Sequence, residues 1–319
     1  MRYFIVGGAG FIGSHLVDRL LSFLATEKVT VYDNFSSGRE WHCKQHVTNP
    51  RFMVMRADVK DQKLLAACMR GHDTVIHLAS NPDISCAATE PDIDFREGTC
   101  LTNNVLEAMR LANASTIIYA SGSGVYGDLG DKEADENHGP LVPISTYGAS
   151  KLAGEALISS YCHMFGFTGR VFRFANVVGP RQTHGVGLDF LRQLLEHPTF
   201  LRILGDGTQS KPYIHVDDVV SAILLVFLND TSSFSVYNVA TSDHVMVKEI
   251  ALMAGECMAL KDVKFEYTGG NRGWKGDIPV VRMNSDRIRG MGWNCRVGSK
   301  EALRKSMVEI LKDLRSEAR

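Results

Sequence analysis

Short apolar runs alternate with amphipathic, helix-length segments over the first half of the chain. The runs predict strands over residues 3–6, 29–32, 52–55, 74–80, 116–120 and 170–174. Apolar residues at helical spacing predict helices over 14–23, 62–69 and 92–113, and another that begins after the cap residue Ser145. Strands that alternate with helices form parallel sheets, so the pattern predicts an α/β fold.

Beyond residue 174 the spacing becomes shorter and mixed. Helical patterns cover 189–196, 219–228, a segment from 247 and the tail 300–314, with one strand over 235–239. We therefore predict a Rossmann-type doubly wound parallel sheet with a smaller, discontinuous C-terminal substrate domain. The first domain takes residues 1–175 and a return segment near 212–240. The second takes 176–211 and 241–319.

A glycine-rich turn joins the first strand to the first helix. In "GGAGFIG", Gly7 allows the tight turn, Gly10 lets the backbone approach a pyrophosphate, and Gly13 lets the helix pack closely on the sheet. Asp33 ends the next strand, where it can accept hydrogen bonds from ribose hydroxyls and repel a 2′-phosphate, so NAD is favoured over NADP. Glycines can simply mark turns, but strand, turn, helix, strand and acid together favour a dinucleotide site.

Other predicted cofactor contacts lie at the helix start and at the carboxyl ends of strands. The loop "NFSSGRE" can cover the adenosine, although a solvated loop is the alternative. These contacts are Phe11, Ile12, Asn34, Ser36, Ser37, Gly38, Asp58, Val59, Leu78 and Ala79. For His77, in the fourth strand, we expect a buried, hydrogen-bonded histidine and no catalytic role.

Composition narrows the class of protein. A net charge of −1 gives no bulk affinity for nucleic acid. No signal peptide and no run of eighteen apolar residues is present, so we expect a cytoplasmic protein with no membrane partner. The seven scattered cysteines suit reduced thiols. His42, Cys43 and His46 resemble metal ligands, but a fourth ligand is missing nearby, so no metal is expected.

Two later motifs carry candidate chemistry. "SGSGVYGD" follows the fifth strand, and Tyr147 and Lys151 in "YGASK" are four residues apart, on one face of a helix. With the glycine turn and Asp33, these motifs resemble the extended short-chain dehydrogenases and, within them, the nucleotide-sugar epimerases. The narrower resemblance is to UDP-glucose 4-epimerases, especially archaeal-type ones, through "RFANVVGPR", "LGDGTQSKPYIHVDD", "YNVATSD" and "RGWKGDIP".

The resemblance implies a role for each matching residue. Tyr147 would be the acid/base on the sugar hydroxyl, and Lys151 would hold the nicotinamide ribose and, with the positive nicotinamide, lower the tyrosine pKa. The substrate contacts would be Asn176, Lys211, Tyr213, Arg272 and Asp277. It also implies NAD as cofactor, a UDP-sugar as substrate, and a homodimer formed through helices near Asn103 and residues 150–165.

Two departures from the family pattern leave the activity open. The strand-end Ser or Thr that hydrogen-bonds the sugar is Gly122 here, flanked by Ser121 and Ser123, and a family asparagine near the cofactor is Gly98. Ser123 or a water can replace the missing hydroxyl; otherwise the activity is low or altered. The first hypothesis is a UDP-hexose 4-epimerase. The alternatives are a nucleotide-sugar dehydrogenase or reductase, and a binding protein with weakened catalysis. A 4,6-dehydratase is disfavoured because residues 122–124 offer no carboxylate.

Overall fold

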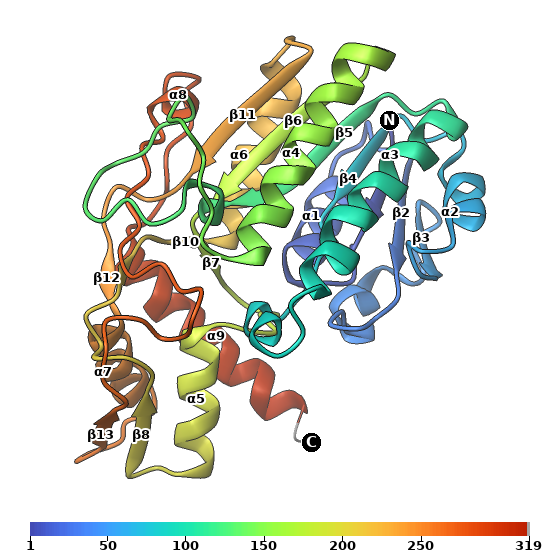
Figure 1. Ribbon diagram of the computed structural model, residues 1–319. Coiled ribbons are helices and arrows are strands. Elements are labelled where there is room, and N and C mark those ends of the chain that lie inside the picture. Colours follow the sequence, from blue (N-terminus) through green and yellow to red (C-terminus); the bar gives the residue numbers. More distant parts are fainter. Residues whose placement is uncertain (318–319) are drawn as a thin grey trace.

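The computed structural model describes residues 1–317 and is built on a seven-stranded parallel sheet covered by helices on both faces (Figure 1). The strand order is β11-β6-β5-β4-β1-β2-β3. The strands are β1 (Arg2–Val6), β2 (Lys28–Asp33), β3 (Phe52–Arg56), β4 (Thr74–His77), β5 (Thr116–Gly122), β6 (Thr168–Phe174) and β11 (Phe234–Val239). The predicted Rossmann-type doubly wound sheet is confirmed.

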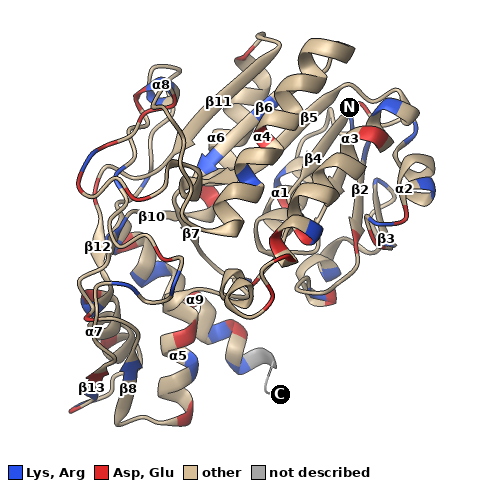
Figure 2. Ribbon diagram, in the orientation of Figure 1, with Lys and Arg blue, Asp and Glu red and all other residues tan. Residues whose placement is uncertain are grey.

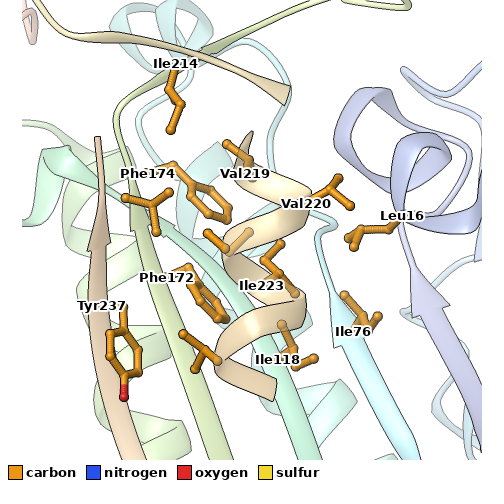
Figure 3. Packing of buried hydrophobic residues seen from close by; sticks show 14 of the residues in the cluster. Leu16, Ile76, Ile118, Phe172, Phe174, Ile214, Val219, Val220, Ile223 and Tyr237 are labelled. Atoms are coloured by element: carbon orange, nitrogen blue, oxygen red, sulfur yellow. The ribbon is translucent and has the colours of Figure 1, made fainter. Parts of the chain in front are cut away.

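Two apolar layers hold the helices against this sheet. On one face, α1 (Phe11–Ser22) and α6 (Val216–Asn229) pack on β4, β5 and β6 through residues such as Leu16, Ile118, Phe172 and Ile223 (Figure 3). The other face is covered by α2 (Gln62–Met69), α3 (Cys100–Ala112) and α4 (Thr146–Phe165). The inner strands are buried on both faces, as in other parallel sheets, which explains their continuous apolar runs, whereas the edge strand β3 is partly exposed.

A third apolar cluster forms a separate, smaller unit. It joins α5 (Val186–Glu196), α7 (Val247–Cys257) and α9 (Ser299–Glu317), with β8 (Phe200–Ile203) paired to β13 (Lys264–Tyr267). These helices carry charged residues of both signs on their outer sides (Figure 2). Residues near α8 (Asp286–Arg289) pack instead on the first cluster. The exact division into the two predicted domains stays a prediction.

Short elements connect the two units. β7 (Asn176–Val178) pairs with β10 (Tyr213–His215), and β9 (Ser210–Lys211) pairs with β12 (Val245–Met246). Short 3₁₀ or π-helical segments are η1 (Glu40–His46), η2 (Ile84–Ala88), η3 (Phe95–Thr99) and η4 (Ser123–Tyr126). No helix within residues 1–317 is both long enough and apolar enough to cross a bilayer.

The helix predicted over 92–113 contains a π-helical turn. Residues 93–94 are α-helical, the turn η3 follows, and regular α-helix continues from Cys100. Gly98, in this turn, lies so close to α4 that a Cβ there would be 2.1 Å from Ser150 Oγ. Hydrophobic spacing cannot reveal this departure, because it depends on the approach of a second helix.

Another glycine sets the distance between α4 and the sheet. A Cβ at Gly154 would lie 2.3 Å from the hydroxyl oxygen and 2.7 Å from Cζ of Tyr119, a buried residue of β5. Since α4 carries Tyr147 and Lys151, this close packing also fixes their height above β5.

We expect Gly154→Ala to destabilise the protein. Overpacking costs about 1–3 kcal/mol, which exceeds the gain in helix propensity of about 1 kcal/mol. Gly255→Ala in α7 is the control, because a Cβ there meets only Val263 Cγ2, at 3.8 Å. Chemical denaturation measures both variants, and equal stabilities would contradict the packing argument.

Candidate functional site

The glycine turn lies at the carboxyl edge of the sheet and is closely packed at Gly7 and Gly13. Gly7 has φ +78°, and a Cβ there would be 2.8 Å from the backbone nitrogen of Ala79. At Gly13 a Cβ would be 2.6 Å from the carbonyl oxygen of Gly7. Only glycine fits these positions, and the predicted pocket residues Leu78 and Ala79 lie directly against the turn.

Asp33 is tied to this turn from the end of β2. Its Oδ2 accepts a hydrogen bond from the backbone N–H of Ala9 at 2.9 Å, and its Oδ1 accepts one from Phe35 N–H at 2.8 Å. Burial raises the pKa of the Asp33 carboxyl, and the two hydrogen bonds oppose that shift. The carboxylate is therefore held at the position where a ribose would lie.

The next two strand ends bring further predicted contacts together. Asn34 donates to Asp58 Oδ2 at 3.1 Å and accepts from the backbone N–H of Ser36. Gly38 packs against Ala9, with 3.0 Å between a Cβ at Gly38 and the Ala9 Cβ. This part of the site is a continuous edge beside the glycine turn.

The remaining predicted cofactor residues contribute in other ways. Phe11 is buried against His15 and Ile12 packs on the first cluster, so the backbone of α1, and not these side chains, faces the edge. Val59 belongs to the second cluster, and Ser37 is half-buried. The close-packed glycines, the helix start and the placed carboxylate fit a dinucleotide.

Tyr147 and Lys151 lie near the start of α4, which the predicted cap Ser145 begins by accepting the Gly148 N–H at 3.0 Å. The buried ammonium of Lys151 donates to the carbonyl oxygen of Ala120 at 2.9 Å. It also lies 5.5 Å from the ring centre of Tyr147. Burial lowers the pKa of Lys151 to about 8.

The pKa of Tyr147 differs from the expectation. Burial raises it, a hydrogen bond with the side chain of Ser80 lowers it, and the negative charge of Asp94 raises it, so the pKa stands above its usual value. The predicted lowering by Lys151 is not produced by the protein alone. The Lys151 ammonium is directed at the Ala120 carbonyl and the faces of two rings, and not at the phenol oxygen.

Sequence reasoning missed Asp94, which is 1% exposed beside Tyr147. Its Oδ1 accepts from Asn81 Nδ2 at 2.9 Å, and its Oδ2 accepts from Thr146 Oγ1 at 2.7 Å. Asn81 follows the end of β4, and Thr146 directly precedes Tyr147. An acid seventeen residues after the end of β4 gives no sequence signal by itself; its partners at functional segments could have suggested it.

The two candidate serines, one at the end of β5 and one directly after it, have different surroundings. Ser121 is buried and donates to Glu155 Oε1 at 2.5 Å, inside an ion pair between Glu155 and Arg173. Ser123 is half-exposed, and its hydroxyl makes no hydrogen bond within the described chain. Gly122 is extended, and a Cβ there would meet only Phe174 O, at 3.8 Å. A side chain is therefore accommodated at position 122.

The Glu155–Arg173 pair was also missed by the sequence reasoning. Arg173 Nη1 donates to the hydroxyl of Tyr126, and that hydroxyl donates to Asn238 Oδ1 at 2.7 Å. This buried network joins α4, β6, the "VYG" segment and β11. Glu155 lies one turn beyond Lys151, and an acid on the buried face of this helix is the signal that could have revealed it.

Three of the predicted substrate residues form one cluster. Lys211 Nζ pairs with Asp277 Oδ1 at 2.5 Å, and Arg272 donates to the backbone oxygen of Asp277. Arg272 Nη2 also pairs with Asp128 Oδ2 at 2.6 Å. The "RGWKGDIP" loop is thus linked to the end of the "VYGD" segment.

The same loop reaches the start of α4. A Cβ at Gly276 would lie 3.1 Å from the Ser145 Cβ, two residues before Tyr147. Asn176 donates to Pro212 O at 3.3 Å, next to Lys211 in the chain. Tyr213 is buried in the third cluster, and burial followed by Asp277 raises its pKa. The loop that holds Arg272 and Asp277 therefore adjoins the segment before Tyr147, whereas the side chain of Tyr213 is buried in the smaller unit.

The structure places the histidines that the sequence singled out. His77 is buried with Nε2 at 3.1 Å from Thr102 Oγ1, and burial lowers its pKa to about 3, but its Nδ1 has no partner in the described chain. His42 bonds Ala9 O and His46 pairs with Asp18, so the two histidines are used separately. Residues 1–317 contain no cluster of three side chains suited to a metal ion.

Comparison with known proteins gives three kinds of match. The model of the NAD dependent epimerase/dehydratase family matches residues 3–240. UDP-glucose 4-epimerase of Mycolicibacterium smegmatis is 31% identical, with 96% of this chain and 97% of that protein covered. A crystal structure of UDP-galactose 4-epimerase is similar with a TM-score of 0.87 at 36% identity, over 98% of this chain and 100% of that chain. Human dTDP-D-glucose 4,6-dehydratase is 26% identical over 96% of this chain and 89% of its own length.

We expect NAD to bind far more tightly than NADP, because the fixed Asp33 carboxylate repels a 2′-phosphate. Calorimetric titration with each dinucleotide measures the difference. Equal affinities would contradict the assignment. Gly10→Val should abolish binding, since the Cβ alone would be 3.2 Å from Gly7 O, whereas Gly255→Ala should bind normally.

Proposed function

The chain belongs to the NAD-dependent epimerase/dehydratase family, and from that premise we propose that it is an epimerase that inverts C4 of a UDP-hexose through a 4-keto intermediate. The family is NAD-dependent, which confirms NAD as the predicted cofactor. The observation that carries the proposal is the position of Tyr147 and Lys151 at the sheet edge, beside a loop that holds Arg272 and Asp277.

In the proposed reaction, bound NAD would serve as the acceptor of a hydride from C4 of the sugar and as its later donor. The Tyr147 oxygen takes the proton of the sugar 4-hydroxyl and gives it back after the 4-keto sugar has turned its other face. Lys151 holds the nicotinamide ribose, and its ammonium is already oriented by Ala120 O. Lys211, Arg272 and Asn176 would bind the diphosphate and nucleotide. Lys211 and Arg272 are paired with Asp277 and Asp128 in the structure, and they would contact the substrate in addition to these carboxylates.

Two alternative activities within the family differ from an epimerase in the catalytic groups or the cofactor turnover that they require. A 4,6-dehydratase needs a free carboxylic acid near the Ser or Thr position, but Ser121 to Gly124 supply none and the nearby Glu155 is paired with Arg173. A net dehydrogenase or reductase would consume external NAD or NADH, whereas an epimerase regenerates its cofactor in each cycle. A binding protein would show neither change.

The deciding experiment incubates the purified protein with UDP-glucose, UDP-galactose and their N-acetyl and uronate analogues. Separation of the products identifies the sugar. The absorbance of NADH, followed after NAD or NADH is added, detects net oxidation or reduction of the sugar.

The proposal also includes a homodimer and a cytoplasmic location. The homodimer would form through α3 and α4, which expose Leu111 and Met164.

We expect Tyr147→Phe to reduce turnover by about 10²- to 10⁴-fold, the usual contribution of a general acid/base. NAD and nucleotide-sugar binding should persist because the ring remains. Tyr161→Phe, on the same helix with its hydroxyl on Glu107, is the control and should keep its activity. A Tyr147→Phe enzyme with more than about a tenth of the rate would exclude Tyr147 as the base.

We expect Ser123→Ala to slow turnover by about ten- to a hundred-fold, because a hydrogen bond to a developing charge contributes about 1.5–3 kcal/mol. Ser121→Ala should have a milder effect on turnover and mainly lower stability, since Ser121 is bonded to Glu155. Gly122→Ser should raise a weak activity, because the backbone accepts a side chain there. If Ser123→Ala is silent and Gly122→Ser only lowers the rate, the sugar hydroxyl is bound by another group.

A further inference from the structure

A buried ion pair lies one helical turn beyond Lys151. Glu155 of α4 is 5% exposed, and Arg173 of β6 is 4% exposed. Arg173 Nε donates to Glu155 Oε1 at 3.0 Å and Arg173 Nη2 donates to Oε2 at 2.7 Å. Ser121 Oγ also donates to Oε1, at 2.5 Å. Both oxygens of the Glu155 carboxylate therefore have close donors.

Lys151 lies beside the same carboxylate but does not pair with it. Residues four apart lie on one face of a helix, so the side chains of Lys151 and Glu155 are neighbours. Both lie over the end of β5, where Lys151 donates to Ala120 O and Glu155 accepts from the next residue, Ser121. Within residues 1–317, Lys151 forms no ion pair, although a buried ammonium is costly without one.

Two carboxylates act on Lys151, and both are occupied by other donors. Burial lowers the pKa of Lys151, and the charges of Asp94 and Glu155 oppose that shift. Asp94 already accepts hydrogen bonds from two other side chains, one on each oxygen. Glu155 shares a helix face with Lys151, and its charge is neutralised by the guanidinium of Arg173. Arg173 is thus the group that competes with Lys151 for Glu155.

We propose that Arg173 is a positioning residue of the proposed epimerase: its ion pair with Glu155 keeps that carboxylate from pairing with the Lys151 ammonium, which stays at Ala120 O and can hold the nicotinamide ribose. Arg173 acts through Lys151 and takes no direct part in the reaction. The consequence for turnover rests on the proposed function, whereas the consequence for the position of Lys151 does not.

A purely structural role for the ion pair would have a different signature. Removal of either partner leaves an unpaired buried charge and destabilises a protein, so the two single variants would then behave alike. If Arg173 restrains Glu155, the two variants differ. Only the loss of Arg173 leaves a carboxylate that can pair with Lys151.

The test compares Arg173→Met, Glu155→Gln and the double variant in the complete protein with NAD. Arg173→Met should lower kcat by about ten- to a hundred-fold and weaken NAD binding by about ten-fold, because the ribose loses a hydrogen bond from a charged group. Glu155→Gln should leave both quantities close to the wild-type values, since the amide oxygen can still accept from Ser121.

The double variant should recover most of the kcat and of the NAD affinity that Arg173→Met loses, because no carboxylate remains to pair with Lys151. Arg173 also donates to the Tyr126 hydroxyl. That bond is absent from Arg173→Met and from the double variant alike, so recovery in the double variant separates the effect on Lys151 from any effect through Tyr126.

Arg170→Met is the matched control. Arg170 lies on the same strand and is buried in an ion pair with Asp230 at 3.2 Å. The variant should lose stability in chemical denaturation without a change in kcat or NAD affinity. A crystal structure of the Arg173→Met protein gives a readout without turnover, in which the Lys151 ammonium should lie on Glu155 instead of Ala120 O.

A double variant no more active than Arg173→Met would overturn the assignment. Equal losses in the two single variants would do so as well, and so would a Lys151 ammonium that stays on Ala120 O without Arg173. Arg173→Gln, which keeps a donor but no charge, replaces Arg173→Met if the latter does not fold, and the same losses are expected. If the wild-type protein converts no UDP-sugar, the proposed function fails, and NAD affinity and the position of Lys151 still decide the role of Arg173.

Discussion

The parallel, in-register pairing of β1, β4, β5 and β6 is the constraint on which the site depends. Val6 is opposite His77, His77 opposite Tyr119, and Ser121 opposite Arg173, so the strands end at one edge of the sheet. Segments from the glycine turn to the "VYG" loop, more than a hundred residues apart, therefore meet there. The glycine turn, Asp33, Ala79 and the "VYG" segment all lie where strands of this sheet end.

Helix α4 is placed against that edge by close contacts and by one carboxylate. Gly154 lets it approach Tyr119, and Gly98 lets η3 approach Ser150. Asp94 then joins the helix start to the segment after β4. The glycines set the distance of α4 from β5 and from η3. The Asp94 carboxylate sets the rotation of the first turn of α4. Gly98 is therefore explained in part by packing, since a Cβ there requires the Ser150 hydroxyl to turn away.

Sequence reasoning reached the features that are encoded locally. The sheet, the Gly7–Gly13 turn, the cap Ser145 and the spacing of Tyr147 and Lys151 follow from periodicity and short motifs. Asp94 and Glu155 are only weakly signalled in that way, because their roles come from partners 52 and 18 residues away in the chain. The same holds for the ion pairs of Lys211 and Arg272. Such contacts depend on which strand ends meet, which periodicity does not specify.

The charges around Tyr147 explain why the protein alone does not make the base. Lys151, with a pKa of about 8, is mostly protonated at neutral pH, but its ammonium donates to Ala120 O. Burial and Asp94 together hold the pKa of Tyr147 above 10, so the phenol keeps its proton. For Tyr147 to be a phenolate at pH 7, its pKa must instead fall to about 7, which corresponds to about 4 kcal/mol relative to the ordinary value. A positive charge beside the ring supplies energy of that size in a buried site, and the oxidised nicotinamide carries one. In the proposed reaction, proton acceptance by Tyr147 would thereby be linked to the presence of the hydride acceptor, because the same positive charge would favour both.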